Sequence, residues 1–244
     1  MKDTMGHFPH YKLVVFDLDG TLTAERSIWE YIHKKLDRWY GFAEKYQSQF
    51  LQGKISYRQF CELDAQVWKG MRVDKLRDIV RGVPFNPGVD ALTSLLKGLD
   101  LKLALISSGL FLLSEWMQEK YGFDYAVANR LLCEDGVLTG EVEIKVHYDR
   151  KAEWVQSIMD MFRIRSNEII AIGDSVGDVE MFEMAGYSIS FNSSSPNLDQ
   201  IADVVIKGND LSHIIPMLPI VRGESEPYGN SDVLSVDTIK GFNG

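Results

Sequence analysis

Residues 13–23 read LVVFDLDGTLT, an apolar run that ends in two carboxylates separated by one residue. Four consecutive apolar residues, two of them valines, are typical of a strand buried on both faces of a parallel sheet. Alternate residues of an extended chain point the same way, so we expect Asp17 and Asp19 to share one side of the backbone. The stretch therefore predicts a central strand whose carboxyl end carries a pair of acidic groups.

Further short apolar runs in the chain have the same character. They are LKLALI at 101–106, EIIAI at 168–172, YSISF at 187–191 and DVVI at 203–206. Amphipathic helical patterns separate them, and this alternation favours an α/β fold with a doubly wound, Rossmann-like parallel sheet. We assign this core to residues 11–23 and 86–219.

Residues 24–85 interrupt the alternation, because no convincing strand pattern occurs in this long interval. Helical patterns fill it, near 27–39, 42–51, 56–68 and 73–81. We therefore predict an inserted all-helical cap domain. Later in the chain, a Glu-Asp-Gly turn at 134–136 between extended flanks predicts a β-hairpin over 129–146.

The two ends of the chain differ from the rest in composition. Residues 1–10 are expected to form a short polar leader, and residues 220–244, with their Gly, Ser, Asn and Pro, a flexible tail. A weak VLSV patch at 233–236 leaves a second interpretation open, in which a short strand docks on the core.

Charge and cysteine content narrow the classes of partner. Lys and Arg number 26 against 35 Asp and Glu, a net charge of −9 that disfavours nucleic acid and anionic membrane as partners. No apolar run approaches the 18 residues of a membrane span, and the first residues lack a signal core. Cys61 and Cys133 form no CxxC pair, so we expect a reducing, cytoplasmic location and no thiolate zinc site.

Polar corners follow the predicted strands. In chain order they are DLDGTLT at 17–23, SSG at 107–109, DRK at 149–151 and GDSVGD at 173–178. Ligands of open α/β sheets bind at the carboxyl ends of the strands, so these groups are expected to meet at one edge. The oxygen ligands of Asp17, Asp19 and Asp174, with no His or Cys nearby, favour Mg²⁺ over zinc. Taken singly, each corner is explained by a solvated turn, a helix cap or a surface charge. Four such corners at the same edge of one sheet are not explained in this way.

The four corners, in this order and spacing, resemble the four motifs of the haloacid dehalogenase (HAD) superfamily of phosphohydrolases, in the form with a helical cap after the first motif. The segment ANRLLCEDGVLTGEVE, residues 128–143, is similar to the hairpin of phosphoserine phosphatases. The resemblance covers about residues 11–218. It implies a Mg²⁺-dependent phosphatase that acts on a small-molecule phosphate ester. Gly177 departs from phosphoserine phosphatases, which commonly have Asn at that position.

The resemblance also implies roles for the acidic residues. Asp17 is the nucleophile that forms an aspartyl-phosphate, and Asp19 is the general acid for the leaving alcohol and then the base for water. The carboxylates of Asp17 and Asp174, with the backbone carbonyl of Asp19, hold the metal. Asp178 is either a metal-site residue or a partner that holds Lys151 from outside the metal's own ligands.

Phosphate binding falls to the second and third motifs. The resemblance assigns the transferring phosphoryl oxygens to Ser107 and Lys151, helped by backbone N–H groups at the helix start after Ser108 and Gly109.

Substrate selectivity is expected to come from the cap. Asp64 lies on or beside the apolar face of the helix at 56–68, where an unpaired carboxylate is costly. Aligned through GKISYRQF, it stands where phosphoserine phosphatases have an Arg that binds the substrate carboxylate. Arg26 stands where they have a Glu for the substrate amine, although a one-residue shift would bring Glu25 there.

Three interpretations of these residues stay open. Arg26 and Asp64 have exchanged roles toward the two charges of phosphoserine; or the substrate is a different ester, and Asp64 selects its polar or cationic leaving group; or Asp64 forms a structural ion pair with Arg26 or another residue. Ten aromatic residues from Trp29 to Trp68 are expected to be mostly cap core. A few of them could line the pocket, and an aromatic cage for a cationic group is one such arrangement.

Two rival functions share this fold. A phosphotransferase would pass the phosphoryl group from Asp17 to an acceptor alcohol instead of water. A non-catalytic module that binds a phosphorylated metabolite is also compatible with the fold, since fold does not fix function. The presence of Asp17, Asp19, Lys151 and Asp174 favours an enzyme.

Overall fold

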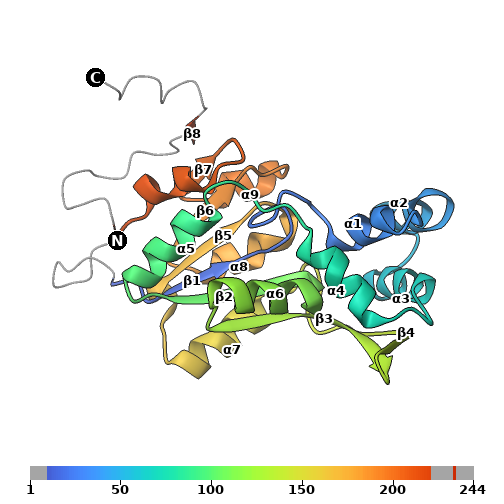
Figure 1. Ribbon diagram of the computed structural model, residues 1–244. Coiled ribbons are helices and arrows are strands. Elements are labelled where there is room, and N and C mark those ends of the chain that lie inside the picture. The colour runs from blue at the N-terminus through green and yellow to red at the C-terminus, as the bar shows by residue number, and fades with distance from the viewer. Residues whose placement is uncertain (1–9, 221–232, 235–244) are drawn as a thin grey trace.

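The computed structural model describes residues 10–220 and 233–234. Within these residues one eight-stranded sheet runs in the order β4-β3-β2-β1-β5-β6-β7-β8 (Figure 1). Its strands are β1 Leu13–Phe16, β2 Lys102–Leu110, β3 Tyr125–Glu134, β4 Val137–Glu143, β5 Ile169–Gly173, β6 Tyr187–Phe191, β7 Val204–Ile206 and β8 Val233–Leu234. All neighbours pair in parallel except β3 and β4, which form an antiparallel hairpin. The predicted parallel α/β core is confirmed.

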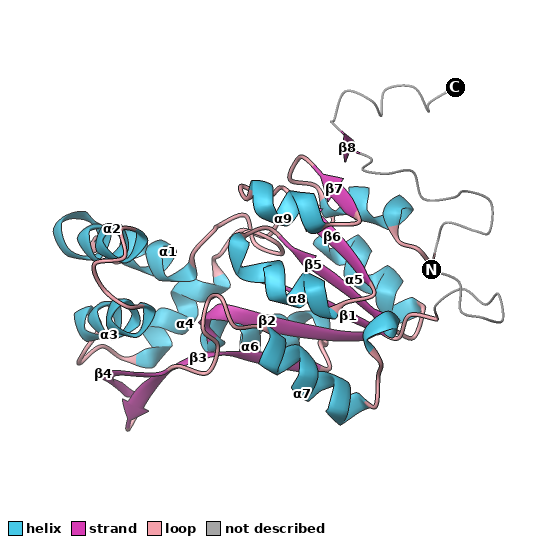
Figure 2. Ribbon diagram, turned by 180° about the vertical axis from the view of Figure 1, so that it is seen from behind, coloured by secondary structure: helices cyan, strands magenta, loops and turns pink. Residues whose placement is uncertain are grey.

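Helices cover both faces of the sheet (Figure 2). On one face lie α5 (Val89–Gly98) and α6 (Phe111–Tyr121), and on the other lie α7 (Ala152–Phe162), α8 (Val179–Met184) and α9 (Pro196–Ile201). The alternation of β1 explains the two layers: Val14 and Phe16 join the apolar cluster of α5 and α6, whereas Leu13 and Val15 join that of α7 and α8.

Four helices form the cap between β1 and α5. They are α1 (Ile28–Lys35), α2 (Glu44–Leu51), α3 (Tyr57–Val67) and α4 (Val73–Arg81), and they stand beside one end of the sheet (Figure 1). The first helix is shorter than its predicted range of 27–39, because Asp37 adopts a left-handed backbone with φ 57°. Cap and core share one continuous apolar cluster, which contains Trp68 and Leu76 together with Leu92 and Leu113.

The β3–β4 hairpin connects the sheet to the cap. Its turn at Asp135 and Gly136 has positive φ at both positions, as the predicted Glu-Asp-Gly turn requires. β3 begins four residues before the predicted hairpin because its first half pairs in parallel with β2, starting at Tyr125 opposite Ala104. Backbone N–H groups of Gly70 and Val73 donate to the hairpin carbonyls of Leu138 and Gly136, so the hairpin supports the cap.

All of the predicted leader at 1–10 except residue 10, and most of the predicted tail at 220–244, lie outside the described residues. Within the tail, Val233–Leu234 pairs in parallel with β7, which favours the docked-strand interpretation for that short stretch. In the described part of the chain, no helix combines the length and the apolar character needed to cross a bilayer.

Candidate active site

The central pair of strands brings two acidic corners together. Asp17 follows β1 and its backbone N–H donates to the carbonyl of Ile172 in β5, 2.9 Å away, while Asp174 follows β5 itself. Both carboxylates are buried, and one oxygen from each, with one from Asp178, lie within 4.8 Å of one another. The predicted meeting of the first and fourth motifs at one sheet edge is thus what the structure shows.

Lys151 neutralises part of this charge. Its Nζ donates to Asp17 Oδ1 at 2.5 Å and to Asp178 Oδ1 at 2.6 Å, and its side chain is only 2% exposed. Burial by itself lowers the pKa of Lys151, but the two carboxylates outweigh it and hold the pKa above its ordinary value. The ammonium therefore stays charged at neutral pH.

Asp178 acts through other residues. While Oδ1 accepts from Lys151, Oδ2 accepts from the backbone N–H groups of Asp174 at 3.0 Å and Ser175 at 2.9 Å. Both of its oxygens are engaged in fixing the lysine and the turn after β5. Of the two predicted roles for Asp178, this geometry favours the partner that holds Lys151.

Asp174 is fixed from the first corner. Oδ1 accepts from the hydroxyl of Thr21 at 3.1 Å, and Oδ2 accepts from Nη1 of Arg26 at 2.8 Å. Gly20 makes this approach feasible: it has φ +86°, and a Cβ there would lie 2.5 Å from Asp174 Oδ2. Arg26 is anchored further by the carbonyl of Asn192 at 2.8 Å and the hydroxyl of Ser194 at 3.3 Å.

The buried carboxylates carry more negative charge than one lysine can offset. Burial raises the pKa of Asp17 to about 6, with a further contribution from Asp178, although Lys151 acts in the opposite direction. Burial, Asp17 and Asp178 also raise the pKa of Asp174 well above its usual range. A divalent cation would relieve this repulsion, and an all-oxygen donor set fits Mg²⁺ better than zinc. The residues present therefore fit the predicted metal.

Asp19 is poised as an acid. Its Oδ1 is buried and has no hydrogen-bond partner among the described residues. Burial, followed by the charge of Asp17, raises the pKa of Asp19 to about 8, which favours the protonated carboxyl. A Cβ at Gly109 would lie 2.3 Å from Asp19 Oδ2, which explains the glycine in the second motif.

The corner at 107–109, which is predicted to bind phosphate, is held by the cap as well as by the core. Ser107 is buried, and its Oγ accepts from the backbone N–H of Gly109 at 2.9 Å. The hydroxyl of Tyr57, on α3, donates to the carbonyl of Ser108 at 2.6 Å. Asn129 Nδ2 donates to the same carbonyl and to the Tyr57 hydroxyl, both at 2.9 Å.

A cavity of about 300 Å³ opens over these groups, between the core corners and the cap. Of the residues predicted for catalysis and phosphate binding, five line it: Asp17, Asp19, Ser108, Gly109 and Lys151. Asp174 and Arg26 also line the cavity, whereas Ser107 is not among the residues that line it. A larger hollow of about 630 Å³ between α3 and the hairpin contains none of the predicted residues, so we place the chemistry in the smaller cavity.

Comparisons with known proteins agree with this geometry. Residues 14–183 match the family described as haloacid dehalogenase-like hydrolase. The chain belongs to this family. It is 31% identical over 208 residues to the phosphoserine phosphatase of Methanocaldococcus jannaschii, covering 84% of this chain and 96% of that protein. The phosphoserine phosphatase of Idiomarina loihiensis is also 31% identical over 208 residues, covering 84% of this chain and 93% of that one.

Solved structures of phosphoserine phosphatases have the same fold as this hydrolase. A phospho-aspartyl intermediate analogue of phosphoserine phosphatase superposes with a TM-score of 0.73 at 29% identity, over 85% of this chain and 99% of the other. A substrate-bound phosphoserine phosphatase complex gives 0.74 at 28% identity, over 85% and 98%. The predicted family, its phosphoserine phosphatase-like character and the expected class, a phosphatase, are confirmed.

The three residues of this hydrolase predicted to select the substrate, Glu25, Arg26 and Asp64, lie in different surroundings. Arg26 lines the cavity, but its guanidinium is paired with Asp174 on the core. Glu25 and Asp64 do not line the cavity. Asp64 is 1% exposed and lies 3.3 Å from Nε2 of His33, which is itself fully buried. An exchange of substrate-binding roles between Arg26 and Asp64 therefore has no support in the geometry, and a structural contact between Asp64 and His33 is favoured.

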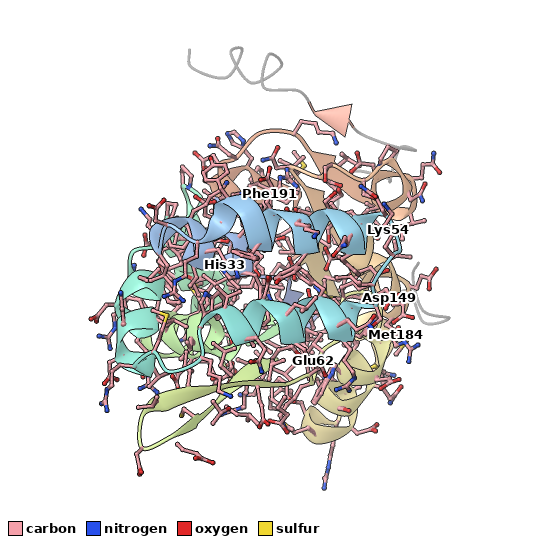
Figure 3. All side chains as sticks on the ribbon, turned by 90° about the vertical axis from the view of Figure 1, so that its right-hand side faces the viewer. His33, Lys54, Glu62, Asp149, Met184 and Phe191 are labelled. Atoms are coloured by element: carbon pink, nitrogen blue, oxygen red, sulfur yellow. The ribbon has the colours of Figure 1, made fainter. Side chains whose placement is uncertain are left out.

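His33 and Asp64 join two cap helices. Figure 3 looks onto the cap and shows His33 of α1 between that helix and α3, which carries Asp64. The His33 ring lies 4.5 Å from the ring of Trp68, which stacks on Trp29 at 5.5 Å. Burial raises the pKa of Asp64, and the nearby His33 opposes the rise.

Two site residues were missed in the sequence, Tyr57 and Asn129. Asn129 stands in the ANR stretch that resembles phosphoserine phosphatases. The resemblance indicates the segment but does not indicate the role of this residue. Tyr57 opens a cap helix, and nothing in the helical period distinguishes it from the other cap aromatics. The departure at Gly177 has a structural explanation, because a Cβ there would lie 2.4 Å from the carbonyl oxygen of Tyr148.

Proposed function

We propose that this hydrolase is a Mg²⁺-dependent phosphomonoester phosphatase that acts on a small phosphorylated metabolite through an aspartyl-phosphate. The observation that carries the proposal is the placement of Asp17 on the cavity wall, with Oδ1 held by Lys151 and Asp19 beside it. Lys151 thereby orients the Asp17 carboxylate on the cavity wall for attack on phosphorus.

The first step transfers the phosphoryl group to the enzyme. An Asp17 oxygen forms a bond to phosphorus as the bond between phosphorus and the ester oxygen breaks, and Asp19 gives its proton to the departing alcohol. A pKa raised to about 8 by burial and by Asp17 favours the protonated form of Asp19 that this role requires. Lys151 and the N–H groups of the 107–109 corner stabilise charge on the phosphoryl oxygens.

The second step releases phosphate. Asp19, now ionised, takes a proton from water, whose oxygen attacks phosphorus and breaks the bond to Asp17. Mg²⁺ held by Asp17, Asp174 and the Asp19 carbonyl would supply positive charge against the anionic phosphate. The cap contacts the phosphate corner through Tyr57, and a cap that closes further over the cavity would limit access of bulk water during the first step.

The substrate is proposed to differ from phosphoserine at the cap. The relatives named above are phosphoserine phosphatases, which supports a small phosphate ester as substrate. The cap positions that would read the two charges of phosphoserine carry Arg26, turned to the core, and Asp64, buried beside His33. We retain the cytoplasm as the proposed compartment, since Cys61 and Cys133 are both free.

The experiment is phosphate release from a panel of phosphorylated metabolites with and without Mg²⁺, comparing the wild type with Asp17→Asn. We expect metal-dependent release in the wild type and a loss of at least about a thousandfold in the variant, because the amide cannot act as nucleophile. Product analysis with added acceptor alcohols separates hydrolysis from phosphotransfer. A wild type that releases phosphate from no ester contradicts the proposal and favours a binding module.

A further inference from the structure

The cavity over Asp17 has two unlike walls. The core wall carries the acidic corners, Lys151 and the phosphate loop. The wall formed by the cap and by the loop before α7 is mostly apolar. Its apolar members are Trp29, Phe50, Leu51, Tyr57, Phe60 and Tyr148, and its uncharged polar members are Ser27 and Gln47. The chemistry proposed above does not use their apolar surfaces. A leaving alcohol that points away from the phosphate corner must meet this wall.

The rings of this wall pack against one another. Phe50 is central: it stacks on Phe60 at 5.3 Å between centroids, meets Tyr148 edge-on at 5.2 Å and lies 5.8 Å from Tyr57. Trp29 continues the surface at 6.3 Å from Phe60. An aromatic cage needs ring faces held apart to enclose a cation, whereas these rings are in contact with each other. The arrangement is a continuous wall and not a cage.

Charged groups are scarce on the cap side. Among the described residues that line the cavity, the one charged side chain from the cap segment is Arg26. Its guanidinium already serves Asp174, Asn192 and Ser194. On the cap side, a carboxylate or an ammonium on the leaving group would therefore meet no free group of opposite charge, only the uncharged Ser27 and Gln47, and its desolvation would be costly.

Gly177 allows the wall to close. A Cβ at this position would lie 2.4 Å from the carbonyl oxygen of Tyr148, so the absence of a side chain lets the Tyr148 loop rest against the turn after β5. The Tyr148 ring then reaches Phe50 on the cap. This contact completes the apolar surface across the boundary between cap and core.

We infer that the alcohol part of the substrate is uncharged and apolar, about the size of one aromatic ring, and packs against Phe50 and its neighbours. The inference rests on the proposed function and narrows it to one class of ester. A cavity of about 300 Å³, at the small end for ligand sites, accommodates a phosphate and one such group.

The test measures binding separately from turnover. Isothermal calorimetry of the Mg²⁺-loaded full chain compares three inert phosphonates: benzylphosphonate, the phosphonate analogue of phosphoserine and that of phosphocholine. We expect benzylphosphonate to bind at least about tenfold more tightly than either charged analogue. Phe50→Ala should remove most of this preference. Phe42→Ala is the matched control, because Phe42 is a cap residue that is 64% exposed and does not line the cavity, and it should keep the preference.

The other outcomes overturn the inference. Tighter binding of the serine analogue indicates a zwitterionic leaving group, tighter binding of the choline analogue indicates a cation, and equal or absent binding of all three removes the apolar selectivity. Phosphate release from the matching esters is measured in parallel. Preference for benzylphosphonate without release from any ester defeats the proposed function alone, and release that is best from phosphoserine defeats the inference alone.

Discussion

Arg26 holds a carboxylate that the proposed metal also needs. Its Nη1 lies 2.8 Å from Asp174 Oδ2, and its side chain is 48% exposed. A guanidinium at this distance competes with a divalent cation through both charge and occupancy of the oxygen. Arg26 is therefore a residue through which the chain can tune metal affinity.

Replacement of this arginine should strengthen metal binding. We expect Arg26→Gln to bind Mg²⁺ roughly two- to fivefold more tightly than the wild type, the upper part of the range for a partly exposed charge pair. Calorimetric titration of the metal-free protein measures the change. Arg81→Gln, which alters an exposed pair with Asp78 on the cap, serves as the control. Weaker binding by Arg26→Gln shows instead that the guanidinium orients Asp174 for the metal.

At the scale of elements, two polar contacts fix the cap. The His33–Asp64 pair joins α1 to α3 inside the cap, and the Tyr57–Ser108 hydrogen bond joins α3 to the core. Both involve buried groups, whose loss costs more than the contact itself contributes because a partner is left unsatisfied.

Loss of Asp64 should affect stability and leave selectivity unchanged. We expect Asp64→Ala to lower the free energy of unfolding by about 1–3 kcal/mol, since the buried His33 ring then loses its nearest carboxylate. Urea unfolding measures this, and phosphate release measures the ranking of substrates, which we expect to be unchanged. Glu62→Ala is the control on the same helix, with a side chain 50% exposed. An altered ranking in a folded Asp64→Ala protein returns Asp64 to a substrate-binding role.

The side chain of Asn129 forms hydrogen bonds with three separate parts of the structure. Nδ2 reaches Ser108 and Tyr57, and Oδ1 accepts from the backbone N–H groups of Lys145 at 2.8 Å and Val146 at 2.9 Å. The phosphate corner, the cap and the loop that leads to Lys151 therefore depend on a single amide.

Truncation of this amide should loosen all three elements. We expect Asn129→Ala to reduce the free energy of unfolding by about 2–4 kcal/mol, because several buried groups lose their partners together. The same variant should bind inorganic phosphate more weakly in calorimetry. Asn167→Ala, at an exposed position, should change stability by less than about 0.5 kcal/mol. A stability loss as small as that of the control contradicts the role assigned to Asn129.

At the scale of the whole molecule, the structure shows where part of the negative charge of the chain lies. Part of the net charge of −9 is gathered at one sheet edge, where Lys151 and Arg26 offset some of it and the proposed cation would offset more. Elsewhere the carboxylates stabilise the fold. Glu168, just before β5, accepts from Lys12 Nζ at 2.7 Å and from the backbone N–H of Arg165 at 2.9 Å, and so fastens the starts of β1 and β5 to each other.

Glu168 should make part of the stability depend on acid. Burial alone raises its pKa, but hydrogen bonds from Arg165 and Lys12 outweigh burial and lower the pKa to about 2 from 4.5. Because the folded-state value is depressed, the contribution is complete above about pH 5 and disappears as the pH falls toward 2. Urea unfolding of Glu168→Gln should therefore converge on the wild type in acid. A gap that is constant with pH would contradict this, and exposed Glu183→Gln is the control.

The local signals of the sequence were sufficient for the core. Runs such as 13–16 and 187–191 became strands with the predicted bounds, because apolar continuity and β-branching are properties of neighbouring residues. Asp17 and Asp174 were predicted to meet because the carboxyl ends of parallel strands share one edge. The family and the reaction class follow from these corners.

The sequence does not predict which side chains contact one another within the cap or between the cap and the core. A helical period shows which face of α3 is buried, but it does not say that Asp64 meets His33 or that Tyr57 reaches Ser108. The pairing of Arg26 with Asp174 depends on the path of the chain between β1 and α1. Sequence pattern therefore determined the core and its acidic edge, and the tertiary structure decided what faces the substrate, because contacts between distant segments arise from packing and not from local period.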